Sequence, residues 1–291
     1  MLSVPRTHSR SRSRRAALTA LAFLTPAIIA VVVLRLWPAA EALVGSLSDR
    51  HGEFTFSTFG RLFTDPTFLG SLRVTLLFSV VINPLQIGLA LLLAVILAQR
   101  VPLVGLWRTM ILLPVAVPQI VSAIIWGVLF RPDGPFNSVL EALGLPSVPW
   151  LTSPEMALWS IVIICSWVGV GYWMTFLVAG IKDIPETLYE AAQLDGAGTW
   201  KRFRHITLPG LRRPLLFVLV ADTVANFLVF APVRQLTQGG PEGSTNVIMN
   251  TIFERAYQIG DIPAASAATV VLIVIVMVIV GIQFRLLPGK D

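Results

Sequence analysis

Charged residues are scarce in this chain of 291 residues: Asp, Glu, Lys and Arg make up only 13% of it, against about 25% in soluble globular domains. Hydrophobic residues make up 55%, and the mean hydropathy is +0.77. A surface with so few charges would not keep a soluble protein of this length in solution. The composition therefore indicates an integral membrane protein with several spans.

Groups for covalent or metal chemistry are also few. The single cysteine, Cys165, excludes an intramolecular disulfide, and its apolar surroundings favour a small buried side chain. The three histidines, His8, His51 and His205, lie in separate polar segments without the spacing of metal ligands. The sequence lacks the phosphate-binding pattern G-x-x-x-x-G-K-[ST]. We therefore expect no metal site, no cofactor bound by this chain and no enzymatic activity.

Six apolar runs are each near or above the ~20 residues that a helix needs to cross a bilayer. They lie at 16–37, 71–98, 106–130, 157–180, 214–233 and 264–287. The sequence thus predicts an all-α integral membrane protein with six transmembrane helices. We divide it into a basic tail at 1–15, a first transmembrane helix at 16–37 and a five-span transmembrane domain at 71–287.

The first 15 residues contain five arginines and no acid. A basic start before an apolar run also occurs in signal peptides. The run at 16–37 is longer than a signal peptide's apolar core, and no small-residue cleavage site precedes Pro38. We interpret it as an uncleaved span preceded by a disordered cytoplasmic tail, and we favour this over nucleic-acid binding by the tail.

Lysine and arginine are distributed unequally between the two sides of the six predicted spans. If the N-terminus is cytoplasmic, 15 of the 22 lie inside and 7 outside; the seven outside are Arg35, Arg50, Arg61, Arg73, Arg131, Arg234 and Arg255. Because cytoplasmic loops of membrane proteins carry the excess of basic residues, both termini are predicted to be cytoplasmic. The loop between the fourth and fifth spans then faces the cytoplasm as well.

That loop is the longest strongly polar segment between apolar ones, and we call residues 185–214 the elbow. Pro185 suits the first turn of a helix, and Gly196 is a natural helix stop because glycine adopts the left-handed cap conformation without strain. A second short helix is predicted from Thr199 to Thr207, halted before Pro209. The elbow is either a solvated connection or a docking element whose small alanine face lets another protein approach closely.

The spacing of residues in the elbow resembles the E-A-A loop of ABC importer permeases of the binding-protein-dependent sugar type. The matching pattern is E-A-A at 190–192, a glycine at 196 and I-T-L-P at 206–209. In that family this loop forms a coupling helix that sits in a groove of the cytoplasmic ATPase subunit. The resemblance implies an ATPase-coupling role for Glu190, Ala191, Ala192, Asp195 and Gly196.

The resemblance extends over about residues 70–287, because L-T-Q-G-G-P at 236–241 and A-A-S-A at 264–267 also look like family segments. It implies a permease subunit in a bacterial cytoplasmic (inner) membrane that passes a sugar or sugar-like solute by alternating access. The implied partners are ATPase subunits that bind ATP and Mg²⁺, a second homologous permease, an extracytoplasmic solute-binding protein and membrane lipid, with no nucleic acid.

Asp222 is the only acidic residue well inside a predicted span, where an ionised group should face a cavity or a partner. Asn226 lies four residues on, on the same helical face. With Asn83 and Gln86 of the second run, they are our candidates for the substrate pathway, where carboxylate and amide groups would bind sugar hydroxyls. A hydrogen bond between helices is the alternative explanation.

Two other classes of protein remain as alternatives. One is a proton-coupled secondary transporter in which Asp222 carries the proton. The other is a membrane-embedded enzyme, which the lack of paired catalytic groups disfavours. The elbow separates the classes, because a secondary transporter has no use for an E-A-A loop.

Overall fold

The computed structural model describes residues 9–49, 51–99 and 102–286, with side chains from Thr19 onward. No strand occurs within these residues, only an isolated bridge between Ser48 and Phe54. The elements are α1 (Ser9–Val31), η1 (Val32–Leu36), α2 (Trp37–Ser46), α3 (Ser57–Thr64), α4 (Pro66–Ala98), α5 (Val104–Leu112), η2 (Leu113–Ala116), α6 (Gln119–Leu129), α7 (Pro135–Ala142), α8 (Pro154–Lys182), α9 (Glu186–Leu194), α10 (Thr199–Arg202), η3 (Phe203–Thr207), α11 (Leu208–Gly210), α12 (Arg212–Phe227), α13 (Ala231–Leu236), α14 (Ile248–Phe253), η4 (Glu254–Ile259) and α15 (Ile262–Leu286).

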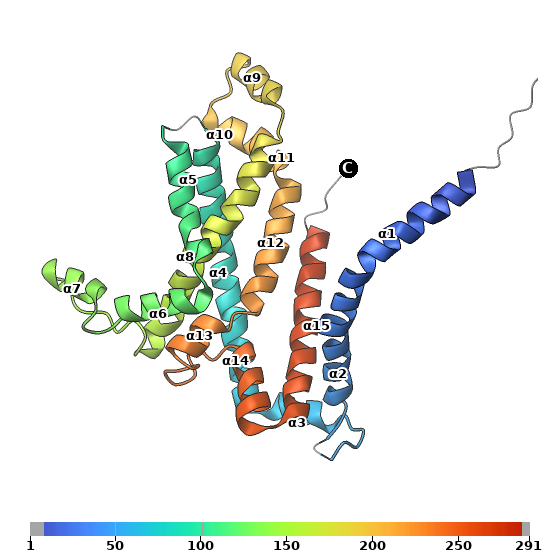
Figure 1. Cartoon of the computed structure of the whole chain (residues 1–291). Helices are drawn as coiled ribbons and strands as arrows, with labels where there is room; N and C mark the ends of the chain where they lie inside the picture. Colours follow the sequence, from blue (N-terminus) through green and yellow to red (C-terminus); the bar gives the residue numbers. More distant parts are fainter. Residues whose placement is uncertain (1–8, 50, 100–101, 287–291) are drawn as a thin grey trace, which may run out of the picture.

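Five of the six predicted spans correspond to helical segments that are long and apolar enough to cross a membrane. These segments are Thr19–Ser46, Pro66–Ala98, Pro154–Lys182, Arg212–Leu236 and Ile262–Leu286. The all-helical membrane fold is therefore confirmed among the described residues. In Figure 1, α4, α8 and α12 run side by side, and α15 lies next to α2 on the other flank.

The third predicted span, at 106–130, is not a single continuous helix. The segment Val104–Ala116 is followed by α6 at an angle of 100°, so the pair forms a broken span or a re-entrant loop. The cause is Pro118: the residue before a proline is pushed out of the helical region, and Val117 accordingly has an extended backbone with ψ of 126°. The second half then leads sideways into α7 (Figure 1).

The first span is longer than predicted at its far end. Pro38 does not end the helix, because the π turn η1 changes the hydrogen-bond ladder just before it and α2 continues to Ser46. At the near end, α1 begins at Ser9. Part of the tail that was expected to be disordered is thus helical, while residues 1–8 lie outside the described residues.

The fifth run, predicted at 214–233, has a break inside it. Helix α12 ends at Phe227, and Phe230 has a non-helical backbone before α13 begins. Pro232 lies at the start of α13, where its missing N–H is tolerated. The break leaves the C-terminal end of α12 inside the helical bundle.

Glycines let α8 pack closely against its neighbours. A Cβ on Gly169 would lie 2.6 Å from Gln86 Nε2 of α4, and one on Gly171 would lie 2.2 Å from the carbonyl oxygen of Ile111 in α5. At Gly171 the obstacle is a backbone atom, whereas at Gly169 it is the end of the Gln86 side chain. The glycine pair in the fourth span therefore serves helix packing, as small residues do between membrane helices.

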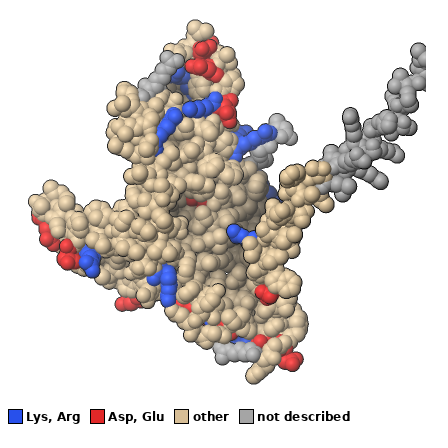
Figure 2. Space-filling model, viewed as in Figure 1, with Lys and Arg blue, Asp and Glu red and all other residues tan. Residues whose placement is uncertain are grey.

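Charged side chains gather near the elbow and near the opposite end of the molecule, with a wide, mostly uncharged zone between them (Figure 2). Such a zone is the surface that a bilayer requires. The first and last described residues, at the start of α1 and the end of α15, lie toward the elbow end in Figure 1.

Candidate functional site

The first half of the elbow folds as the sequence predicts. Helix α9 follows Pro185 and ends at Leu194. Gly196 has φ of +73°, the left-handed conformation expected of a helix stop. The N–H of Ala197 donates to the carbonyl oxygen of Ala192 at 2.8 Å, which closes the helix end. The turn thus fixes the direction in which α9 projects from the molecule (Figure 1).

The second half of the elbow differs from the prediction at its end. The chain passes from α10 through the π turn η3 into α11. Pro209 lies inside α11, so the helical path does not end before this proline. Proline is tolerated there because it occupies the first turn of α11, where an N–H is not required. The helical path therefore runs almost to α12, with only Leu211 between them.

A cavity of about 590 Å³ lies between the elbow and the ends of α4 and α8. Glu186, Tyr189 and Glu190 of α9 line one side, and Arg202 of α10 lines another. The Tyr189 hydroxyl lies 2.9 Å from that of Thr207, which joins α9 to η3 across the loop. This contact, which the sequence did not reveal, makes the two halves of the elbow one unit.

The five residues of the expected coupling motif lie on or just after α9. Four of them, Glu190, Ala191, Asp195 and Gly196, are exposed, and Ala192 is half-buried. The neighbouring Leu194 is 90% exposed, an unusual state for a leucine outside the apolar zone. The outer surface of the elbow is therefore open to a partner, and no residue of this motif is hidden in the bundle.

The four candidate pathway residues meet in one place between α4 and α12. The Asn226 amide nitrogen lies 2.7 Å from Asn83 Oδ1, 3.0 Å from Asp222 Oδ1 and 3.3 Å from Gln86 Oε1. Asp222, Asn226 and Gln86 are each less than 10% exposed. In this conformation their side chains contact one another, as expected if they form hydrogen bonds between helices. Their contact with a passing solute stays a prediction.

Two more side chains complete this polar network, which we define as Asn83, Gln86, Asp222, Thr223, Asn226 and Gln283. Thr223 Oγ1 accepts hydrogen bonds from Asn83 Nδ2 at 3.1 Å and Gln283 Nε2 at 2.7 Å. Gln283 belongs to α15 and was not among the candidates. It lies near the end of the last apolar run, and only tertiary packing brings it to Thr223.

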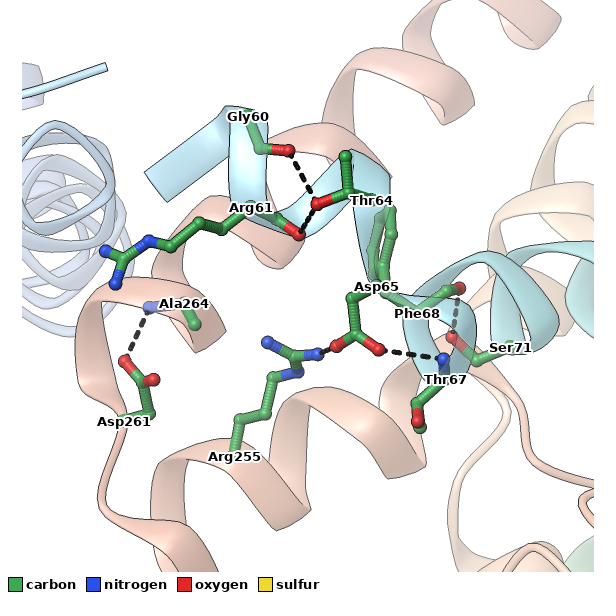
Figure 3. Close-up of polar contacts among 10 residues, drawn as sticks. All are labelled: Gly60, Arg61, Thr64, Asp65, Thr67, Phe68, Ser71, Arg255, Asp261 and Ala264. Atoms are coloured by element: carbon green, nitrogen blue, oxygen red, sulfur yellow. Dashed lines mark hydrogen bonds and ion pairs between the residues drawn. The ribbon is translucent and has the colours of Figure 1, made fainter. Parts of the chain in front are cut away.

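At the end of the molecule opposite the elbow, a charged clamp joins three elements (Figure 3). Asp65 accepts a hydrogen bond from the Thr67 N–H at 2.8 Å, which caps α4, and also pairs with Arg255 of η4. Asp261 accepts from the Ala264 N–H at 3.2 Å at the start of α15. Burial lowers the pKa of Arg255, and the charge of Asp261 opposes that shift. The clamp fixes α4 relative to η4 and α15.

Comparison with known protein families identifies the family to which the chain belongs. The family described as "Binding-protein-dependent transport system inner membrane component" matches residues 86–290. The chain belongs to this family. Its members are transport subunits and not enzymes. The apolar helical segments accordingly place it in the inner membrane.

Curated relatives align with most of the chain. The lactose transport system permease protein LacF of Rhizobium radiobacter is 35% identical over 271 residues, covering 90% of both chains. The sn-glycerol-3-phosphate transport system permease protein UgpA of Agrobacterium fabrum is 34% identical over 269 residues, covering 89% of this chain and 91% of the relative. The trehalose/maltose transport system permease protein MalF of Thermococcus litoralis is 37% identical over 226 residues, covering 77% and 72%.

Solved structures share the fold. A bacterial ABC transporter involved in the import of the acidic polysaccharide alginate has a chain with a TM-score of 0.86 at 24% identity, covering 96% of this chain and 99% of that one. A second structure of a bacterial alginate transporter, in complex with a pentasaccharide-bound periplasmic protein, gives 0.85 at 24% identity. At this identity the likeness establishes the arrangement of helices in the family fold.

Proposed function

We propose that this chain is the permease subunit of an ATP-driven ABC importer for a sugar or sugar-like solute. The single observation that carries the proposal is the elbow: an E-A-A loop folded as an exposed helix, closed by a left-handed glycine, in a chain of the binding-protein-dependent family. The named relatives for lactose, glycerol phosphate and trehalose/maltose support the sugar class.

The elbow faces the cytoplasm in this proposal, with both termini on the same side. The Lys and Arg distribution supports that orientation, as do the start of α1 and the end of α15, which both lie toward the elbow end of the molecule (Figure 1). Helix α9 docks on an ATPase subunit through Glu190, Ala191, Ala192, Asp195 and Gly196. Because Tyr189 and Thr207 join the two halves of the elbow, a movement of α9 is passed to α12.

The solute passes along a surface to which α4 and α12 contribute, and a second homologous permease completes the pathway. Asp222, Asn226, Asn83 and Gln86 belong to that pathway in our proposal. Their burial in a network means that a solute reaches them only when the helices separate. Alternating access supplies such a separation, driven by ATP closing the ATPase dimer while a binding protein delivers the solute at the opposite side.

The test is purification from the native membrane in mild detergent, followed by reconstitution. The proposal expects an ATPase subunit to co-purify and uptake to require ATP and a loaded binding protein. Uptake by the isolated chain, driven by a proton gradient without ATP, would instead establish the secondary-transporter alternative.

A further inference from the structure

The first membrane span carries an arginine in its interior. Arg35 lies in the π turn η1, between α1 and α2 of the helical segment Thr19–Ser46. At a rise of about 1.5 Å per residue, it is about 16 Å from Ser46 and about 24 Å from Thr19 along the helix. Arg35 was near the end of the span predicted at 16–37, and the continuation of the helix through α2 moves it inside the span.

Contact with α15 fixes the depth of this span. Helix α2 packs against α15, and a Cβ on Gly45 would lie 3.1 Å from Ser266 Oγ, near the start of α15. The end of α2 is therefore level with the end of another membrane span (Figure 1). With a hydrocarbon layer about 30 Å thick, Arg35 lies near the middle of that layer. Only side chains near helix ends extend to the membrane surface, so Arg35 is too deep to reach lipid phosphates.

Arg35 has no partner within the described part of the chain. It forms no ion pair with an acidic side chain there. Glu41 is the nearest acid along the helix, but helical side chains meet at spacings of three or four, and Glu41 accepts a hydrogen bond from Trp37 Nε1 at 2.8 Å. An arginine in a protein does not lose its proton. Its charge therefore needs an anion from outside this chain.

The surface around Arg35 is open to such a partner. None of the residues in the most apolar part of this span is buried, whereas the other four helical segments bury 28–50% of theirs. Arg35 is exposed, as are Leu34 and Leu36 beside it. A π turn inside a helix frequently marks a functional position. Because hydrocarbon offers no anion, a charge at this depth on an uncovered span indicates contact with another protein chain.

We propose that Arg35 forms an ion pair with a carboxylate in a membrane helix of the second permease. This inference rests on the second permease of the proposed function and adds the chemistry by which the two chains recognise each other. The guanidinium can donate two parallel hydrogen bonds to a carboxylate, and each charge offsets the cost of placing the other in hydrocarbon. The exposed apolar residues beside Arg35 exclude water from the pair.

The experiment treats the purified complex with a membrane-permeant carbodiimide. Arg35→Lys keeps the positive charge and supplies an amine. The carbodiimide activates a carboxylate, the amine attacks it to form an amide, and the reagent leaves as a urea. We expect a cross-link between position 35 and an acidic residue in a span of the second permease, located by mass spectrometry of the peptides. Wild type should give no cross-link at this position. Val33→Lys should give none to that acid, because side chains two positions apart lie on different faces of a helix.

The second readout is the amount of second permease that co-purifies per molecule of this chain. Arg35→Leu leaves the partner's carboxylate without a counter-charge, so we expect a several-fold loss. Arg35→Lys should retain most of the wild-type amount. Arg131→Leu, which removes an exposed arginine from a loop, is the control and should change nothing. If Arg35→Leu does not insert in the membrane, the cross-link decides.

The proposal is overturned if position 35 couples only to Glu41 or another carboxylate of this chain, or to none in a complex that contains the second permease. Undiminished co-purification in Arg35→Leu also overturns it and leaves the guanidinium to lipid headgroups. These results refute the ion pair and leave the proposed function intact. A wild-type complex that contains the ATPase but lacks a second permease would refute both the ion pair and that part of the proposed function.

Discussion

At the scale of single residues, the turn after α9 depends on one backbone conformation. Gly196 has φ of +73°, and a Cβ built there would meet nothing within 4 Å. The constraint on this position is therefore conformational and not steric. Gly198 has open space around it as well, but its φ of −66° suits any residue. The two glycines, two positions apart, separate the effect of the left-handed conformation from that of added volume.

Replacing Gly196 by valine should uncouple transport while the protein still inserts in the membrane. The left-handed conformation costs an L-residue about 1–2 kcal/mol, and a β-branched side chain adds to this, so the turn changes and α9 no longer points toward its partner. Solute-stimulated ATP hydrolysis and uptake per assembled complex are the measurements. Gly198→Val should leave both close to wild type, and equal losses in the two variants would contradict the conformational explanation.

Asp222 allows a second prediction at this scale. Asp222→Asn keeps a hydrogen-bonding side chain beside Asn226, so partial uptake with altered affinity is expected. Asp222→Leu should abolish uptake without loss of assembly with the ATPase. Uptake normalised to assembled complex is measured for both. Complete loss in the asparagine variant would instead favour a proton carrier, and full activity per complex in the leucine variant would remove Asp222 from the pathway.

At the scale of helices, α8 depends on its glycines for contact with α5. A Cβ on Gly171 would lie 2.2 Å from a backbone carbonyl oxygen, which cannot move aside as a flexible side chain can. Gly171→Ala should therefore destabilise the protein by about 1–3 kcal/mol, as overpacking does, and lower the thermal midpoint of the purified complex. Gly88→Ala in α4, where nothing lies within 4 Å, is the matched control and should be neutral or slightly stabilising.

The helices were predictable from the sequence where length and hydropathy alone decide them. The runs at 157–180 and 264–287 agree with α8 and α15 within three residues at each end. Two differences from the prediction depend on the surroundings of a proline. The helix continues through Pro38 because a π turn precedes it, whereas the chain bends by 100° at Pro118. Hydropathy is high on both sides in each case, so an average over a window cannot distinguish them.

The two candidate sites, the elbow and the polar network, differ in how much of each could be predicted from the sequence. The elbow is local in sequence, so the helix α9, its glycine stop and its exposed motif could be predicted directly. The Tyr189–Thr207 contact and the continuation of the helical path past Pro209 were missed. In the polar network, single hydrogen bonds join residues up to 143 positions apart. Asn83, Gln86, Asp222 and Asn226 could be recognised as polar residues inside apolar runs. Their convergence on Asn226, and the hydrogen bond from Gln283 to Thr223, depend on how α4, α12 and α15 pack.

At the scale of the whole molecule, the account requires a fixed orientation in the membrane. In a variant whose native cysteine is removed by Cys165→Ala, a cysteine at Gln238 should react with an impermeant thiol reagent applied to intact cells. A cysteine at Thr199, in the elbow, should react only after the membrane is opened. Both positions are exposed, so accessibility across the membrane is the variable. The reverse labelling pattern would contradict the cytoplasmic elbow.

The central claim is that α9 docks on an ATPase subunit, and photo-cross-linking in native membranes tests it most directly. A photoreactive residue replaces Leu194, which is 90% exposed at the end of α9. In the control it replaces Leu143, which is 70% exposed just after α7. The account predicts that the Leu194 probe captures a protein whose peptides include a G-x-x-x-x-G-K-[ST] motif, and that the Leu143 probe does not. Capture of that protein by Leu143 alone, or by neither probe while uptake remains intact, would contradict the claim.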